Sequence, residues 1–311
     1  MENKKLTIFQ GGIIFSVTEA LFLIFSLLHI FDNFLISGAV GEIGIILLPS
    51  VIFIIVLKVD IKKNLRIKKI GAVNSLIIVV TMLFSIPISL VASYISVILV
   101  NLIFKNNIIA DIPIPQNFPE LLLSIIVIGF IAAVSEEIFF RGVLFSSVEK
   151  LGVKKSFIII SVLFALFHFN FEKAIGVFIL SLIICYIVYR TNSVLAGILA
   201  HFTNNATVLI ISFISVKLLP KDMNSAQSIT DIAHQNISII IFTIIGLGFI
   251  ALICSFAIIG LMNILKNRTE DSKIQYKQQG IINKKAFISF VPGLLIMSGV
   301  YIHLLLKYIA N

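Results

Sequence analysis

Apolar runs separated by short polar segments make up most of the chain. An α-helix needs about 20 mostly apolar residues to cross the hydrocarbon core of a bilayer. The pattern therefore predicts an all-α, polytopic bundle of eight or nine transmembrane helices. The expected spans are 11–31, 43–57, 72–104, 120–149, 156–169, 173–190, 193–218, 237–265 and 286–306.

Two of these runs leave the exact count open. The run at 72–104 contains Pro87 and is long enough for one tilted, kinked helix or for a span followed by an interfacial piece. The run at 156–169 is short for a span and would have to be flanked by other helices.

The composition agrees with a chain that is solvated mainly by lipid. Hydrophobic residues make up 59% of it and charged residues 13%, whereas a soluble domain is about half apolar and about a quarter charged. The net charge of +9 does not indicate a nucleic-acid partner, because the basic residues lie between apolar runs. The expected surroundings are a lipid bilayer, and the abundance of Ile, Asn and Lys is typical of a bacterium with low-GC DNA.

The distribution of Lys and Arg predicts the orientation, since cytoplasmic loops carry an excess of both. With the N-terminus in the cytoplasm and nine alternating spans, 18 cations fall on inside segments and 5 on outside segments. The richest inside segments are 58–69 and the basic linker 266–285. We therefore expect a multi-pass protein of the cell membrane with a cytoplasmic N-terminus.

Ionisable residues inside spans are rare and are functional candidates by default. Here they cluster on three predicted helices, as Glu136, Glu137 and Arg141; His168; and His201, with Asn204 and Asn205 close behind. Counted from the nearest cytoplasmic helix end, Glu136, His168 and Asn205 each lie 14 residues into a span, and His201 lies 10 residues in. These depths correspond to about 15–21 Å. The groups are thus expected at one level, inside the membrane.

Helical spacing also predicts which way these side chains face. Glu137 and Arg141 are four residues apart, so they share a helix face and can neutralise each other. Glu136 is turned by about 100° from Glu137 and is free to face a cavity. His201 and Asn205 share another face, and Phe164 lies four residues before His168. By contrast, Glu42 is expected near a span end and is interpreted as structural, and Glu19 is a weaker candidate in the first span.

A carboxylate, two imidazoles and an amide are sufficient for hydrolysis. Glu136 could take a proton from water with the help of His168, while His201 and Asn205 could donate hydrogen bonds to an oxyanion. The same polar groups could instead form a structural ion pair and interhelical hydrogen bonds, but their common depth favours a site. Glu136, His168 and His201 could also bind Zn²⁺. The carboxylate interpretation is favoured and requires no cofactor.

At these residues the sequence resembles the CPBP family of intramembrane proteases, which includes CAAX prenyl proteases and bacteriocin-processing enzymes and is also called the Abi family. Its pattern is E-E-x-x-x-R, F-x-x-x-H and H-x-x-x-N on successive helices, and the chain carries these elements at 136–141, 164–168 and 201–205. The resemblance covers about 118–215.

The resemblance implies a helical membrane fold and an intramembrane endopeptidase whose substrate is a peptide or a membrane protein. It implies that Glu136 and His168 activate water, that His201 and Asn205 stabilise the oxyanion, and that Glu137 and Arg141 support the architecture. Bacterial members are linked to peptide or bacteriocin maturation and to immunity. The family is described both as metal-dependent and as glutamate-based.

The resemblance also suggests a division into N-terminal helices (1–117), a catalytic core (118–218) and C-terminal helices (219–311). Two other functions stay open. One is a proton-coupled transporter that uses the same residues as a relay, although no internal repeat typical of such folds is present. The other is a non-catalytic immunity or scaffold protein.

Overall fold

The computed structural model describes residues 5–104, 114–218, 237–274 and 284–310. Every regular element in this part of the chain is a helix, and eight helices are long and apolar enough to cross a membrane. This confirms the predicted all-α, polytopic bundle. The eight segments are Ile8–Leu28, Phe34–Val56, Ala72–Val100, Phe118–Leu151, Ala174–Thr191, Val194–Leu218, Ile245–Arg268 and Lys284–Lys307.

The run at 156–169 is shorter than a full span. It forms α9 (Val153–Phe167), whose 15 residues extend over about 22 Å, whereas the hydrocarbon core is about 30 Å thick. The helix packs against α10 (Ala174–Thr191), so the two form an antiparallel pair joined by a short turn. His168 begins this turn.

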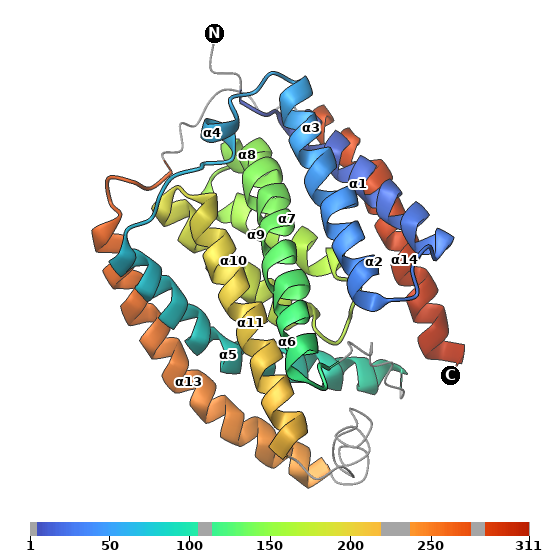
Figure 1. The fold of residues 1–311 in the computed structure, drawn as a ribbon, viewed down its shortest axis with the longest axis vertical. Coiled ribbons are helices and arrows are strands. Elements are labelled where there is room, and N and C mark those ends of the chain that lie inside the picture. The colour runs from blue at the N-terminus through green and yellow to red at the C-terminus, as the bar shows by residue number, and fades with distance from the viewer. Residues whose placement is uncertain (1–4, 105–113, 219–236, 275–283, 311) are drawn as a thin grey trace.

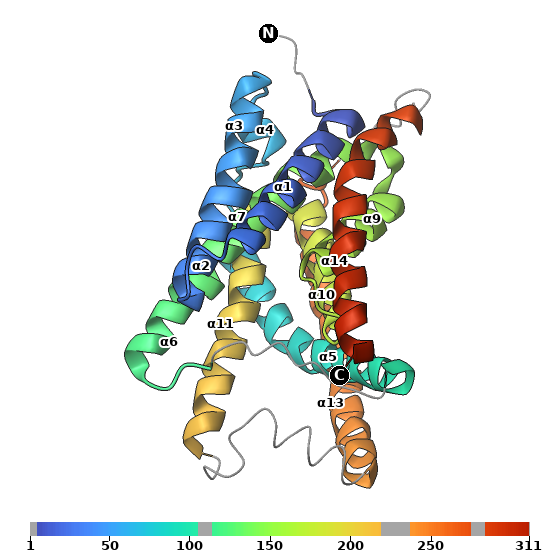
Figure 2. The same cartoon turned by 90° about the vertical axis from the view of Figure 1, so that its right-hand side faces the viewer.

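The run at 72–104 is one helix rather than two. α5 (Ala72–Phe104) continues through Pro87 for 33 residues. Figure 2 shows it running obliquely across the bundle. A tilted path explains how a helix longer than a bilayer crossing is accommodated.

The segment 118–151 forms one unbroken helical run, here called the central helix. Its parts are α6 (Phe118–Ser124), η2 (Ile125–Ile131), α7 (Ala132–Glu137), η3 (Ile138–Leu144), α8 (Phe145–Val148) and η4 (Glu149–Leu151). η2 and η3 wind as wider π-helical turns, which often occur at functional sites. They lie on either side of the adjacent glutamates of α7.

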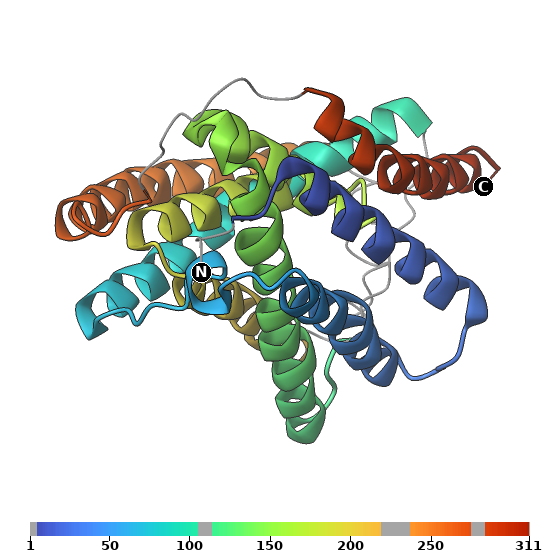
Figure 3. The ribbon, with the colours of Figure 1, turned by 90° about the horizontal axis from the view of Figure 1, so that it is seen from above.

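The central helix lies between two groups of helices, as the view from above in Figure 3 shows. On one side, α5 packs against α10, α11 (Val194–Leu218) and α13 (Ile237–Arg268). On the other side, α1 packs against η6 and α14. The two groups flank the central helix in Figure 1 as well, and α7 contacts both α11 and η1 (Gly41–Leu47). The remaining bounds are α1, Ile8–Leu28; η6, Lys284–Phe290; and α14, Val291–Ala310.

The second span begins earlier than the hydrophobic pattern predicts. It joins α2 (Phe34–Val40), η1 (Gly41–Leu47) and α3 (Leu48–Val56) without a break. The side chain of Asn33 accepts a hydrogen bond from the backbone N–H of Ile36 and so caps the helix start. Consequently Glu42 lies in the interior of the helical run, and its predicted place near a span end is wrong.

Phenylalanine rings form much of the core around the central helix. Phe139, Phe140 and Phe145 are fully buried. The Phe140 ring packs edge-on against that of Phe164 in α9, with 5.0 Å between ring centroids. Such pairs contribute about 0.5–1.5 kcal/mol beyond the burial of their area. This packing fixes α9, and therefore Phe164 and His168, against the central helix.

The segments predicted to face the cytoplasm meet at one end of the bundle. The backbone N–H of Val194 donates to the backbone carbonyl of Arg66 at 3.1 Å. The backbone N–H of Ile274 donates to the backbone carbonyl of Tyr189 at 2.9 Å. Hydrogen bonds from Lys273 and Arg190 lower the pKa of Glu270 at this end to about 2. The linker predicted at 266–285 starts as a helix, because α13 continues to Arg268. Residues 275–283 of this linker lie outside the described residues, and so do residues 1–4.

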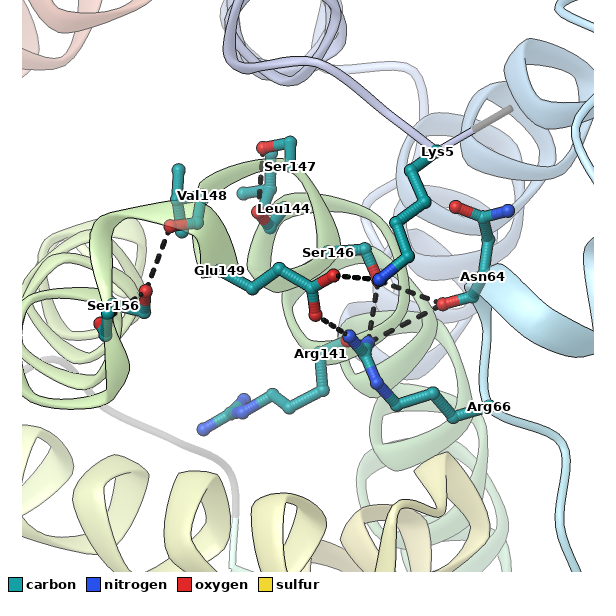
Figure 4. A network of polar contacts seen from close by, with 11 residues as sticks. Lys5, Asn64, Arg66, Arg141, Leu144, Ser146, Ser147, Val148, Glu149 and Ser156 are labelled. Carbon is teal, nitrogen blue, oxygen red and sulfur yellow. Dashed lines mark hydrogen bonds and ion pairs between the residues drawn. The ribbon is translucent and has the colours of Figure 1, made fainter. Parts of the chain in front are cut away.

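A buried polar network ties this end to the central helix (Figure 4). The Arg66 guanidinium forms an ion pair with Glu149 and donates to Ser146 Oγ at 2.6 Å and to the Arg141 carbonyl at 3.2 Å. Lys5 Nζ also reaches Glu149, at 2.8 Å. Gly142 allows the loop at 65–66 to pack closely against the central helix, because a Cβ at position 142 would lie 2.5 Å from Leu65 Cδ2. The loop at 65–66 therefore positions the π-helical turn that carries Arg141.

Arg66→Ala is expected to lower the free energy of unfolding by about 3–5 kcal/mol, because it leaves the buried Glu149 carboxylate without its main partner. Chemical unfolding in detergent micelles would measure the loss. Lys62→Ala is the matched control, since Lys62 is exposed in the same segment and should change stability by less than about 0.5 kcal/mol. Equal stability of the two variants would contradict a positioning role for the network.

Candidate active site

The predicted ion pair between Glu137 and Arg141 is confirmed. Arg141 Nη1 lies 2.9 Å from Glu137 Oε1, and both side chains are fully buried. The guanidinium also donates to Ser181 Oγ of α10 at 2.7 Å and to the Ser181 carbonyl at 3.3 Å. It lies over the Phe164 ring, 4.4 Å from the centroid, where a cation–π contact adds attraction. Arg141 thus holds α9 and α10 against the central helix.

Glu137 also orients the second histidine of the site. His201 Nδ1 lies 3.0 Å from Glu137 Oε1, and a carboxylate oxygen that already accepts from Arg141 can only accept here as well. Nδ1 of His201 therefore carries the proton. The close approach depends on Gly197, one turn earlier on α11, because a Cβ there would lie 2.7 Å from Glu137 Oε2.

Phe164 connects the two histidines. Its ring centroid lies 4.8 Å from that of His168 and 5.7 Å from that of His201. His168 Nδ1 lies 2.8 Å from the backbone carbonyl of Phe164, which can only accept a hydrogen bond, so this nitrogen too carries a proton. In each neutral ring, Nε2 is then the basic nitrogen.

Glu136 does not take part in the ion pair of its neighbour. Its side chain is only 8% exposed, and its Oε2 accepts no hydrogen bond within the described residues. The Glu136 carboxyl instead lies within hydrogen-bonding reach of the Glu42 carboxyl. The structure thus separates the two adjacent glutamates as helical spacing predicts: Glu137 holds Arg141 and His201, and Glu136 does not.

Asn205 lies one turn beyond His201 on α11. Its Nδ2 donates to the Ile128 carbonyl in η2 at 2.9 Å, and its Oδ1 accepts from Asn204 Nδ2 at 3.1 Å. The amide group is therefore held from both ends. Because an amide nitrogen carries two N–H donors, one donor of Asn205 remains for another acceptor.

The candidate zinc ligands Glu136, His168 and His201 do not form a ligand cluster. Across the described residues, no three His, Cys, Asp or Glu side chains gather in a way that could hold a metal ion. Glu136, His168 and His201, the possible Zn²⁺ ligands in the sequence, therefore do not fit a metal site in this geometry.

The sequence interpretation missed three residues that shape the site. Ser181 and Gly197 come from helices other than the central one, and only their small size and position inside spans could have drawn attention to them. Glu42 carried a stronger signal, because it is an acidic residue beside an apolar run. Its helix simply starts earlier than the apolar pattern does.

Comparison with known families supports the motif-based resemblance. Residues 118–207 match the family model described as Type II CAAX prenyl endopeptidase Rce1-like. The matched range contains Glu136, Glu137, Arg141, His168 and His201, together with Asn205. Searches among curated proteins and among solved structures found no match. Residues 118–207 of the chain are thus similar to the Rce1-like CAAX endopeptidases, in agreement with the CPBP resemblance of its motifs.

Proposed function

We propose that the protein is an intramembrane endopeptidase that hydrolyses a peptide bond in a membrane-associated protein or peptide. One observation carries the proposal: Glu136 is a buried carboxyl group that stays outside the ion pair of the adjacent Glu137. A buried carboxylate that is not committed to a cation is suited to act as a general base. The family match adds that the related proteins are endopeptidases.

In the proposed reaction, Glu136 takes a proton from a water molecule, and the oxygen of that water attacks the carbonyl carbon of the peptide bond. His168 accepts a hydrogen bond from the same water through its basic Nε2. The carbon–nitrogen bond then breaks, and the proton held by Glu136 passes to the leaving amine. The products are a new carboxyl terminus and a new amino terminus.

His201 and Asn205 are proposed to stabilise the oxyanion that forms in this reaction. Because the Nδ1 proton of His201 is directed at Glu137, its Nε2 can donate to the oxyanion only when the ring is doubly protonated. Glu137 stabilises that imidazolium. We also propose that no metal ion takes part, because a carboxylate and an imidazole can supply the proton transfers that hydrolysis needs.

The proposed location is the cell membrane, with the charged end of the bundle in the cytoplasm. The gathering of the cation-rich segments at that end supports this orientation. The proposed substrates carry an apolar or lipid-modified segment, in keeping with the CAAX prenyl endopeptidases of the family. Maturation of membrane-active peptides, or immunity to them, is a fitting biological role.

Comparing the membrane peptidomes of cells that produce wild-type protein and Glu136→Gln tests the proposal. New peptide ends present with the wild type and missing with the variant are expected, and they would identify the substrate. Glu19→Gln is a matched control, because Glu19 is another buried carboxyl group in a span and lies outside the proposed site. Identical peptidomes for wild type and Glu136→Gln would contradict the proposal.

Asn205→Ala is expected to lower kcat by about 10²–10³-fold with little change in KM, because it removes an oxyanion donor that acts in the transition state. Asn204→Ala is the control, since Asn204 donates to the amide oxygen of Asn205 and has no role in the proposed reaction, so this variant should lose far less activity. Steady-state cleavage of the identified substrate measures both. An Asn205→Ala variant with the wild-type kcat would contradict the proposed role of Asn205 as an oxyanion donor.

A further inference from the structure

Glu42 and Glu136 come from different spans and meet inside the bundle. Glu42 lies in η1, which packs directly against α7, where Glu136 lies. Their carboxyl groups are within hydrogen-bonding reach of each other. In both residues Oε2 is shielded from solvent and accepts no hydrogen bond from any described residue.

Two ionised carboxylates can only accept hydrogen bonds. A hydrogen bond between two carboxyl groups therefore requires a proton on one of them. Like charges that share a shielded site also disfavour double ionisation, which is why a pair of this kind keeps a single proton.

The neighbouring charged groups do not remove this requirement. The elements packed against η1 and α7 contribute Glu19 from α1, Arg141 from η3 and His201 from α11, and Glu137 is adjacent in α7. Arg141 forms its ion pair with Glu137, and the Nδ1 proton of His201 is also directed at Glu137. Glu19 is acidic and cannot neutralise a second carboxylate. Within the described residues, no cation on these elements forms an ion pair with Glu42 or Glu136.

We infer that Glu42 and Glu136 share one proton and that Glu42 is a positioning residue for the proposed hydrolysis. In the resting state Glu42 carries the proton and donates it in a hydrogen bond to Glu136. Glu136 thereby remains a carboxylate that is held in one orientation toward water. After Glu136 has taken a proton from water and passed it to the leaving amine, the pair again holds one proton, so the proton count balances over a turnover.

The shared proton is measured by infrared spectroscopy of the purified full-length protein in liposomes at neutral pH, where a protonated carboxyl group has its own C=O stretching band. Glu42→Gln is expected to remove one such band, because glutamine donates a hydrogen bond without a titratable proton. Glu136→Gln is expected to shift or remove the same band. Glu19→Gln should leave this band in place. A spectrum in which Glu42→Gln removes no band, or in which Glu136→Gln leaves the Glu42 band unmoved, overturns the inference.

Activity provides a second readout, and it rests on the proposed function. Glu42→Ala should lower kcat by about 10²-fold, and Glu42→Gln should restore most of it, because the amide still donates to Glu136. A Glu42→Gln variant with a kcat as low as that of Glu42→Ala overturns the positioning role.

The two proposals can fail separately. A wild type that shows the Glu42-dependent band but cleaves nothing would contradict the proposed function and leave the carboxyl pair standing. A wild type that cleaves its substrate without such a band would contradict the pair alone. Melting temperatures of all variants confirm that each one is folded.

Discussion

Replacing Glu136 by glutamine is expected to lower kcat by about 10⁴-fold, the upper range for loss of a general base, while the protein stays folded. Glutamine has nearly the same shape as glutamate but cannot take a proton from water. Stability should be preserved because Glu136 forms no ion pair with any residue that the structure describes, and because an amide at this position can still form a hydrogen bond with Glu42. Steady-state kinetics in liposomes and a thermal melt would measure the two effects.

The adjacent glutamate supplies the contrast for this prediction. Glu137→Gln should affect stability as well as rate, because Glu137 is fully buried against Arg141 and His201. If Glu136→Gln destabilised the protein and Glu137→Gln did not, the assignment of the two glutamates would be reversed. A kcat within about tenfold of wild type for Glu136→Gln would contradict its role as the base.

Arg141→Met is expected to lower the free energy of unfolding by about 3–5 kcal/mol, because it leaves the Glu137 carboxylate buried without its cation. The double variant Glu137→Gln/Arg141→Met should lose less than the sum of the two single variants, since replacing both partners of a buried pair by neutral groups leaves no unpaired charge. Chemical unfolding of the four proteins completes the cycle. Strict additivity would contradict a direct interaction between the two side chains.

The loss of activity in Arg141→Met should exceed what instability alone explains. Arg141 joins Glu137, Ser181 and the Phe164 ring, and Phe164 in turn contacts both histidines. Ser181→Ala is a suitable comparison, because it removes one hydrogen bond from Arg141 and keeps the charge pair. It should cost about 1 kcal/mol.

The features that depend on short-range spacing could be predicted from the sequence. The hydrophobic runs located the spans, because an apolar helix of sufficient length has few alternatives in lipid. The Glu137–Arg141 pair follows from residues four apart on one helix. The separation of Glu136 from that pair follows from the rotation per residue.

Contacts between distant segments could not be predicted in the same way. Nothing local to Glu42 indicates that η1 packs against α7, and the early start of its helix depends on a capping asparagine that hydrophobicity does not register. The proximity of Ser181 and Gly197 to the ion pair is likewise set by tertiary packing.

The most direct test is cleavage of the identified substrate by purified protein in liposomes prepared in water labelled with heavy oxygen. The wild type should release two fragments, and the new carboxyl terminus should carry one labelled oxygen atom from water. Glu136→Gln, verified as folded, should release neither fragment. Fragment release by Glu136→Gln at the wild-type rate would contradict hydrolysis by this carboxylate, as would substrate-dependent proton flux without any cleavage by the wild type.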